Sequence, residues 1–199
     1  TFPKFDNTWN EEDSDKKLAY RKFWERDEGG YYTDGTPKEH NLIQKYDSRY
    51  SKSWNEFLKH AWSEEFIKKL VEVTGVEVTG LRHFCFMYAK KDGFQSPHIH
   101  NVSDKTLIVF LYFSKNWEEG DPGGTYLSDG RDESKILFEP YDLDNTSLFV
   151  LDGPNAAHGV RRITKDVERR AIQLTYEPFS TTDGWYGQPN KDIPEPIEL

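Results

Sequence analysis

Two histidines separated by one residue stand directly before an apolar run in the segment SPHIHNVSDKTLIVFLY, at residues 96–112. Side chains at positions i and i+2 of an extended strand point to the same face, so His98 and His100 can converge on one point. A third histidine, His158, opens the later β-rich segment HGVRRITKDVERRAIQLTYE. Two ligands from one strand and a third from a distant strand can hold a metal ion inside a β-barrel or sandwich. We therefore predict one divalent metal bound by these three residues, although histidine pairs also occur on exposed strands.

Strand parity divides the segment ERRAIQLTYE, at residues 168–177, into two different faces. One face carries a cation, polar groups and a small residue: Arg169, Ala171, Gln173 and Thr175. The other is mainly apolar and is expected to pack against a covering layer: Arg170, Ile172, Leu174 and Tyr176. In the earlier strand, Ile108, Phe110 and Tyr112 share a face. A cavity that holds a metal, a guanidinium and a phenol suits a small dicarboxylate, which would chelate the metal at one end and meet the guanidinium at the other.

The elements that must position these residues form an α+β arrangement. Ser53 and Glu56 match a capping box that starts one helix, and Ser63 starts a second helix, whose apolar stripe stops before Gly75. From Leu81 onwards, short β-rich runs alternate with Gly, Pro, Asp and Asn clusters. These runs lie at residues 81–90, 106–113, 124–127, 135–140, 146–153, 158–163 and 168–177. They predict a double-stranded β-helix (jelly roll) supported by N-terminal helices.

We divide the chain into three parts. Residues 1–52 are charged but rich in aromatic side chains, which predicts an extension packed on the core, with one short helix near residues 14–26. Residues 53–177 form the helices and the jelly roll. Residues 178–199 contain several prolines and are expected to form an irregular tail.

Composition limits the classes of function. A chain of 199 residues can bury a core as one domain, and a single cysteine, Cys85, excludes an internal disulfide framework and suits the cytoplasm. Cys85 lies in an apolar run and is expected to be a buried thiol. No apolar stretch approaches ~20 residues and no signal-like N-terminus is visible, so we expect no membrane association. The net charge of −9 disfavours nucleic acid and favours a basic partner.

The segment from residue 88 to residue 176 resembles the iron(II)- and 2-oxoglutarate-dependent oxygenases, specifically their prolyl 4-hydroxylase-like branch. That pattern runs from a Tyr about ten residues before a His-x-Asp motif, through an apolar strand followed by Trp and a double glycine, to a His-x-Val and an Arg-x-Ala strand. The corresponding residues here are Tyr88, His98, His100, Tyr112, Trp117, Gly123, Gly124, His158, Val160, Arg169 and Ala171. The resemblance covers roughly the C-terminal half of the chain.

The resemblance implies both a cofactor set and roles for individual residues. It implies Fe(II), 2-oxoglutarate and O2, with ascorbate as a further candidate. His98 and His158 would be iron ligands. Tyr88, Tyr112 and Arg169 would hold 2-oxoglutarate, with Arg169 at its far carboxylate.

His100 departs from that pattern, because the family has Asp at this position. A histidine does not open the site as the Gly or Ala of halogenating relatives does, so halogenation is not supported. Three interpretations of His100 stay open: a three-histidine iron site, a degenerate site that binds metal poorly, or an introduced substitution. We predict that His100→Asp raises 2-oxoglutarate turnover, because aspartate would return the negative charge to an otherwise intact motif. If His100 has its own hydrogen-bond partners, the same change should lower it.

The leading functional prediction is a hydroxylase that decarboxylates 2-oxoglutarate and acts on a prolyl or other residue of a protein or peptide. The alternative from another class is a jelly-roll module that binds metal, 2-oxoglutarate or peptide without turnover. A third candidate is a three-histidine dioxygenase that uses no 2-oxoglutarate, which the set Tyr88, Tyr112 and Arg169 disfavours. The sequence leaves the substrate's identity and the oligomeric state open.

Overall fold

A computed structural model describes residues 2–24, 46–100, 105–153 and 155–178. The strands are β1 (Asn10–Ser14), β2 (Lys17–Phe23), β3 (Gly80–Ala89), β4 (Phe94–His98), β5 (Leu107–Phe113), β6 (Thr125–Ser128), β7 (Ile136–Phe138), β8 (Asp144–Leu151), β9 (His158–Val160) and β10 (Arg169–Glu177). The helices are α1 (Lys52–Ala61) and α2 (Glu64–Thr74), with a short 3-10 helix at Glu133–Lys135.

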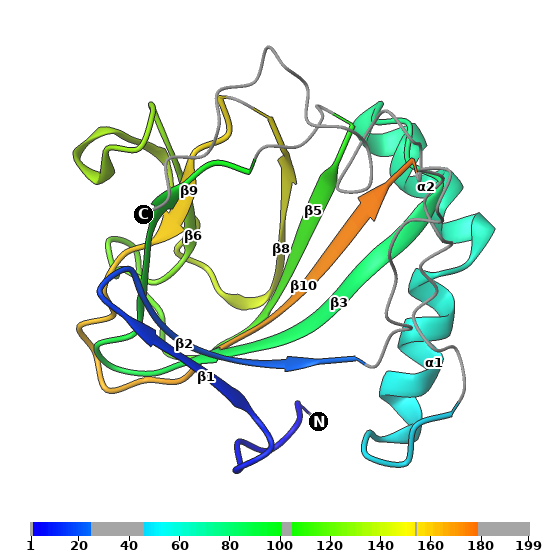
Figure 1. Ribbon diagram of the computed structural model, residues 1–199, viewed down its shortest axis with the longest axis horizontal. Helices are drawn as coiled ribbons and strands as arrows, with labels where there is room; N and C mark the ends of the chain where they lie inside the picture. The colour runs from blue at the N-terminus through cyan, green and yellow to red at the C-terminus, as the bar shows by residue number, and fades with distance from the viewer. Residues whose placement is uncertain (1, 25–45, 101–104, 154, 179–199) are drawn as a thin grey trace, which may run out of the picture.

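The strands form one curled antiparallel sheet in the order β7-β6-β9-β4-β2-β3-β10-β5-β8, and β1 pairs with β2. Figure 1 shows β6 and β9 on one side of the molecule, and β3, β10 and β5 rising on the other side towards the helices. The architecture is the predicted jelly roll with two supporting helices. Each of the seven β-rich runs read from the sequence contains an observed strand, β3 or β5 to β10.

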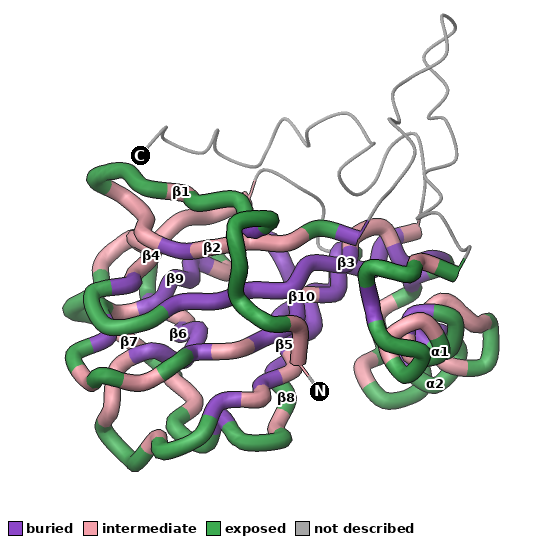
Figure 2. The backbone as a smooth tube through the Cα atoms, turned by 90° about the horizontal axis from the view of Figure 1, so that it is seen from below, coloured by how far each residue is buried: buried purple, intermediate pink, exposed green. Residues whose placement is uncertain are grey.

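Alternate residues of β3, β5 and β10 separate two hydrophobic clusters. The outer cluster lies against α1, α2 and the N-terminal segment, and it includes Phe84, Phe86, Val109, Ile172 and Tyr176. The inner cluster lies inside the curl, and it includes Cys85, Met87, Ile108, Phe110, Tyr112 and Ala171. Figure 2 shows buried residues running along β3, β10 and β5, with the helix pair to one side. The expected parity of residues 108–112 and 169–176 is confirmed.

The two helices begin with serine caps. Ser63 accepts a hydrogen bond from the Phe66 N–H, and Gly75 ends α2 in the left-handed conformation with φ of 72°, as the sequence predicts. The start of α1 differs from the prediction, because its N-cap is Ser51, which accepts from the Trp54 N–H. Only Ser53 has a Glu three residues later, so the capping box pointed to the wrong serine. The earlier serine becomes the cap because Asn55 binds the carbonyl oxygens of residues 47 and 51 and fixes that turn.

The prediction of a short helix near residues 14–26 is wrong, because residues 17–23 form β2. This strand pairs with β3 through Tyr20 and Tyr88 and with β4 through Leu18 and Phe94. The N-terminal segment therefore supplies an interior strand of the sheet. The expected tail, residues 179–199, lies outside the described residues. None of the helices in the described part of the chain is long and apolar enough to cross a membrane.

Candidate metal centre and its cavity

The structure brings the three predicted histidines together at one end of a cavity. His98 ends β4 and is the register partner of His158, which begins β9, while His100 follows two residues after His98. One nitrogen from each ring lies within 4.8 Å of the other two. The ring centroids are 4.3 to 5.0 Å apart. The i, i+2 spacing and the strand pairing therefore produce the convergence expected from the sequence.

Each of these imidazoles has its Nδ1 atom next to an oxygen acceptor. Nδ1 lies 3.1 Å from the Ser96 carbonyl oxygen in His98 and 2.8 Å from the Ala156 carbonyl oxygen in His158. In His100 it lies 2.7 Å from Asp152 Oδ2. An Nδ1–H that donates to oxygen fixes the tautomer and leaves the Nε2 lone pair for a metal. All three residues are therefore oriented as Nε2 ligands.

Asp152 is a site residue that the sequence analysis did not single out. It follows β8 and is 1% exposed, and its Oδ1 accepts the Gly153 N–H at 3.1 Å. Its backbone N–H donates to the Thr106 carbonyl oxygen at 2.9 Å. The Gly153 N–H thus holds the carboxylate that contacts His100, and the bond to Thr106 holds the main chain of Asp152. A turn-forming Asp-Gly pair carries no sequence signal for such a role, because it is common in turns.

Burial and mutual repulsion keep His98 and His158 neutral. Burial first, and then the charges of His158 and His100, lower the pKa of His98 to about 2. Burial first, and then His100, lower the pKa of His158 to about 4. The Gln95 amide nitrogen lies 3.2 Å from His98 Nε2. A metal ligand must be neutral imidazole, so this trio suits a divalent cation, which would displace the Gln95 amide.

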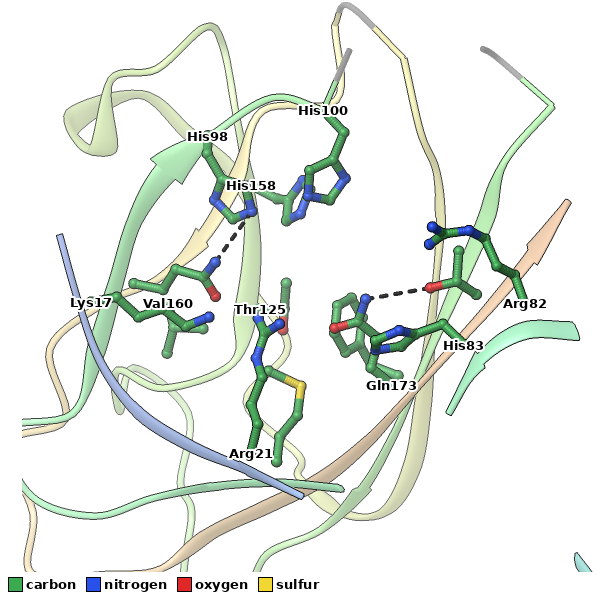
Figure 3. A pocket seen from close by; sticks show the side chains of 14 residues that line it. Lys17, Arg21, Arg82, His83, His98, His100, Thr125, His158, Val160 and Gln173 are labelled. Carbon is green, nitrogen blue, oxygen red and sulfur yellow. Dashed lines mark hydrogen bonds between the residues drawn. The ribbon is translucent and has the colours of Figure 1, made fainter. Parts of the chain in front are cut away.

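The cavity beside the histidines has a volume of about 420 Å³. Besides the histidine trio, it is lined by side chains from seven strands: Lys17, Arg21, Arg82, His83, Met87, Gln95, Phe110, Thr125, Val160, Gln173 and Thr175. Figure 3 shows the histidines at one end and Arg21 directed into the cavity from the opposite side. The polar face expected for residues 169–175 does line the cavity, through Gln173 and Thr175. The sequence analysis missed Lys17, Arg21 and Arg82. For the first two a signal was available, because Lys17 and Arg21 alternate with apolar residues, as expected of a strand.

Arg169 lies one layer behind this wall. It is 2% exposed, its Nε donates to the Gly123 carbonyl oxygen at 2.6 Å, and one terminal nitrogen donates to Thr125 Oγ1 at 3.1 Å. Its guanidinium carbon lies 5.5 Å from the centre of the Tyr112 ring. No carboxylate of the described residues forms an ion pair with it, and burial lowers its pKa. Burying a guanidinium costs free energy unless hydrogen bonds or an opposite charge compensate for the lost hydration.

The double glycine that precedes β6 makes this arrangement sterically feasible. A Cβ atom on Gly124 would lie 2.2 Å from the Pro140 carbonyl oxygen, and Gly123 has φ of 134° with its missing Cβ 2.8 Å from Trp117. Larger residues at either position would move the carbonyl group that Arg169 binds. The structure therefore explains why Gly123, Gly124 and Trp117 occur near Arg169.

The structure places Tyr112 and Tyr88, both expected at the co-substrate, in different environments. Tyr112 lies in the inner cluster, where its hydroxyl accepts the Thr125 N–H at 3.1 Å. Tyr88 belongs to the outer cluster, donates to Glu168 at 2.9 Å and stacks on Phe5. Met87 faces the cavity, so its neighbour on the strand must face outwards. The structure thus does not bring Tyr88 to the cavity.

Solved structures of other proteins share this fold. A Pseudomonas putida prolyl-4-hydroxylase gives a TM-score of 0.57 at 10% identity, over 85% of this chain and 77% of that one. A 2OG-Fe(II) oxygenase family protein from Burkholderia pseudomallei gives 0.55 at 14% identity, over 89% and 76%. A prolyl hydroxylase from Trichoplax adhaerens, in complex with a hypoxia inducible factor peptide fragment, gives 0.54 at 14% identity, over 86% and 71%. No family model matches the sequence, and no curated protein matches it.

Proposed function

We propose that this protein is an iron(II)- and 2-oxoglutarate-dependent oxygenase whose metal is held by His98, His100 and His158. The observation that carries the proposal is the convergence of three imidazoles, each with Nδ1 next to an oxygen acceptor, at one end of a cavity. A buried guanidinium without a carboxylate, that of Arg169, lies behind the cavity wall. The bound iron would supply the activation of dioxygen, and the protein supplies binding, orientation and charge.

Asp152 supports His100 as a native ligand in this proposal. Three histidines bring no negative charge to a metal, whereas two histidines and one carboxylate bring one unit. The buried Asp152 carboxylate, 2.7 Å from His100 Nδ1, places that unit one hydrogen bond away from the ligand. Carboxylate–histidine pairs of this type orient the ring and raise the basicity of the ligand nitrogen. We therefore favour a working three-histidine centre over a degenerate one.

The co-substrate would lie between the metal and Arg169. One carboxylate of 2-oxoglutarate would bind the metal, and the far carboxylate would face the wall formed by Thr125. The Thr125 hydroxyl accepts from Arg169, so its own proton is free to be donated into the cavity. Tyr112 fixes Thr125 by accepting its backbone N–H. Arg169 thus supplies the charge that retains the dianion, and Thr125 supplies the direct contact.

The substrate class in this proposal is a prolyl or other residue of a protein or peptide. Support comes from the Trichoplax adhaerens prolyl hydroxylase, which has the same fold and was solved with a peptide fragment.

The test is the formation of succinate from 2-oxoglutarate under air by the iron-loaded protein. We expect turnover by the wild type and by His60→Ala, a change in helix α1, and no turnover by His158→Ala. Metal analysis should show near-stoichiometric iron in the first two proteins and its loss from His158→Ala. Equal iron content in all three proteins would refute the metal site. Full iron and tight 2-oxoglutarate binding without succinate would establish the non-catalytic binding module instead.

A further inference from the structure

The N-terminal strand β2 places two cations in the cavity wall. Lys17 and Arg21 lie four residues apart on β2 and therefore share a face. Figure 3 shows both side chains reaching the cavity, with Arg21 pointing towards the histidine end. Their side chains are only 15% and 17% exposed. These are thus cations of the cavity interior rather than of the outer surface.

One carboxylate serves both of these cations. Glu12 on β1 is the register partner of Ala19, between the two, and its Oε2 lies 2.6 Å from Lys17 Nζ and 3.1 Å from Arg21 Nε. The Arg21 contact lacks hydrogen-bond geometry, and its buried Nε has no hydrogen-bond partner among the described residues. Burial first, and then repulsion from Arg21, lower the pKa of Lys17. Because the single carboxylate of Glu12 faces two cations, Lys17 and Arg21, this group of three side chains carries one positive charge in excess.

The rest of the described cavity wall offers nothing to neutralise this excess. Arg82 is balanced by the buried Glu177 at 3.4 Å, and no Asp or Glu of the described residues lines the cavity. In a protein with a net charge of −9, the three cations that line this part of the cavity face two nearby carboxylates, Glu12 and Glu177, and the remaining unit of positive charge is a local reversal of sign. Such a reversal raises the local concentration of anions.

We infer that the substrate carries a compact anionic group, a carboxylate or a phosphate, that binds beside Lys17 and Arg21. This inference rests on the proposed function, which assigns one carboxylate of 2-oxoglutarate to the metal and the other to the wall before Arg169. The co-substrate then leaves the excess charge on β2 without an anion. The net charge alone favours a basic partner, but the part of the substrate that enters this cavity would be acidic. It would be an acidic residue next to the hydroxylated position, or the phosphate of a phosphorylated small molecule.

The test uses the full chain loaded with Ni(II) and saturated with 2-oxoglutarate, titrated calorimetrically with inorganic phosphate and, separately, with acetate at constant ionic strength. We expect one phosphate per chain, weakened about tenfold by Arg21→Gln because a charge-assisted contact is lost. Arg21→Gln leaves Lys17 paired with Glu12, so the fold keeps a balanced pair. Glu12→Gln should tighten phosphate binding, since it frees both cations. Lys22→Gln, on the opposite face of β2, should leave it within about twofold. The ratio of phosphate to acetate affinity distinguishes a phosphate from a carboxylate substrate.

Equal phosphate affinity in wild type and Arg21→Gln, or no phosphate binding at all, would overturn the inference. Displacement of 2-oxoglutarate by phosphate would also overturn it, because Lys17 and Arg21 would then hold the co-substrate. If the wild type binds no 2-oxoglutarate, the proposed function fails by itself. The phosphate titration of the Ni(II)-loaded protein without 2-oxoglutarate, repeated on Arg21→Gln, then decides the anion site separately.

Discussion

The two faces of β3, β10 and β5 have the same backbone but different tasks. The outer face buries aromatic and aliphatic side chains against helices and contributes packing. The inner face near the histidines presents Gln173, Thr175 and Met87 to a cavity. Adjacent residues of one strand therefore have different roles: Met87 lines the cavity, whereas Tyr88 packs in the outer cluster. The comparison predicts that outer-face changes lower stability and inner-face changes lower binding.

The largest effect is expected on the outer face. Phe86 is fully buried and contacts the rings of Tyr50, Trp54 and Phe84. Phe86→Ala should lower the free energy of unfolding by about 3–5 kcal/mol, because a large cavity remains. Denaturant titration measures this loss, while the metal content of the folded fraction should stay unchanged. The inner-face control Gln173→Ala should lower stability by less than about 1 kcal/mol. A larger loss of stability in Gln173→Ala than in Phe86→Ala would contradict this division of roles between the two faces.

Arg169 and Arg170 provide the next test, since they are neighbours on opposite faces of β10. Arg169→Ala should weaken 2-oxoglutarate binding about a hundredfold, equivalent to about 2–4 kcal/mol, because the buried charge that retains the dianion and the hydrogen bond that holds Thr125 are both lost. Arg170 is half-exposed and pairs with Glu168, so Arg170→Ala should change affinity little. Calorimetry on the Ni(II)-loaded variants measures both. Thermal unfolding of each variant shows whether it is folded, and the reverse order of affinities would mean that the phase of β10 is assigned incorrectly.

A smaller effect is expected from Asp152→Asn, which keeps the shape of the side chain but removes its charge. Metal affinity should fall about 10–100-fold, because a partner that orients a ligand is weakened. Competitive Co(II) titration followed by absorption measures the loss. Asp144→Asn, at the exposed start of β8, serves as the matched control and should leave Co(II) affinity unchanged. Equal Co(II) affinity in all three proteins would show that Asp152 has no role at the metal.

His100→Asp tests the same pair from the other side. The shorter carboxylate would leave the buried Asp152 without its histidine partner and place two acids close together. We therefore expect less succinate per iron than in the wild type. Faster turnover at matched iron content would instead mean that His100 is an impaired position.

The smallest effect on 2-oxoglutarate affinity is expected from changes at the two tyrosines. Tyr112→Phe removes the hydroxyl that accepts the Thr125 N–H, and 2-oxoglutarate affinity should fall about fivefold, equivalent to about 1 kcal/mol. Tyr88→Phe removes a hydrogen bond to Glu168 on the outer face and should change affinity less than twofold. Calorimetry on the two variants measures both changes. A larger effect from Tyr88→Phe would show that the outer face contributes to co-substrate binding.

Regular alternation explains what the sequence could predict. The strands from residue 81 onwards have a period of two and clear turn residues, so their faces and the convergence of His98, His100 and His158 could be predicted. The placement of Tyr88 was taken from a resemblance and conflicts with parity, because Met87 on the same strand faces inwards. A single-residue difference in register is enough to turn a side chain to the other face.

The missed features depend on contacts between distant segments. In β2, apolar Leu18 and Tyr20 alternate with Lys17 and Arg21, but charged residues at interior positions of a sheet do not resemble a buried strand. Their burial depends on Glu12 on the neighbouring strand, which forms ion pairs with both. Likewise, Asp152 contacts His100 only because the end of β8 lies beside the start of β5. Sequence spacing contains no information about that contact.

The position of β2 between β3 and β4 also has a consequence for folding kinetics. β3 and β4 are close in the chain and can approach each other early, whereas β2 must return across a long sequence separation to pair with Tyr88 and Phe94. Closing such a loop is entropically unfavourable, and non-local strand pairing is slow. β2, which precedes both of its partners in the chain, is thus expected to dock late, and the cavity with its two cations is completed only at that step.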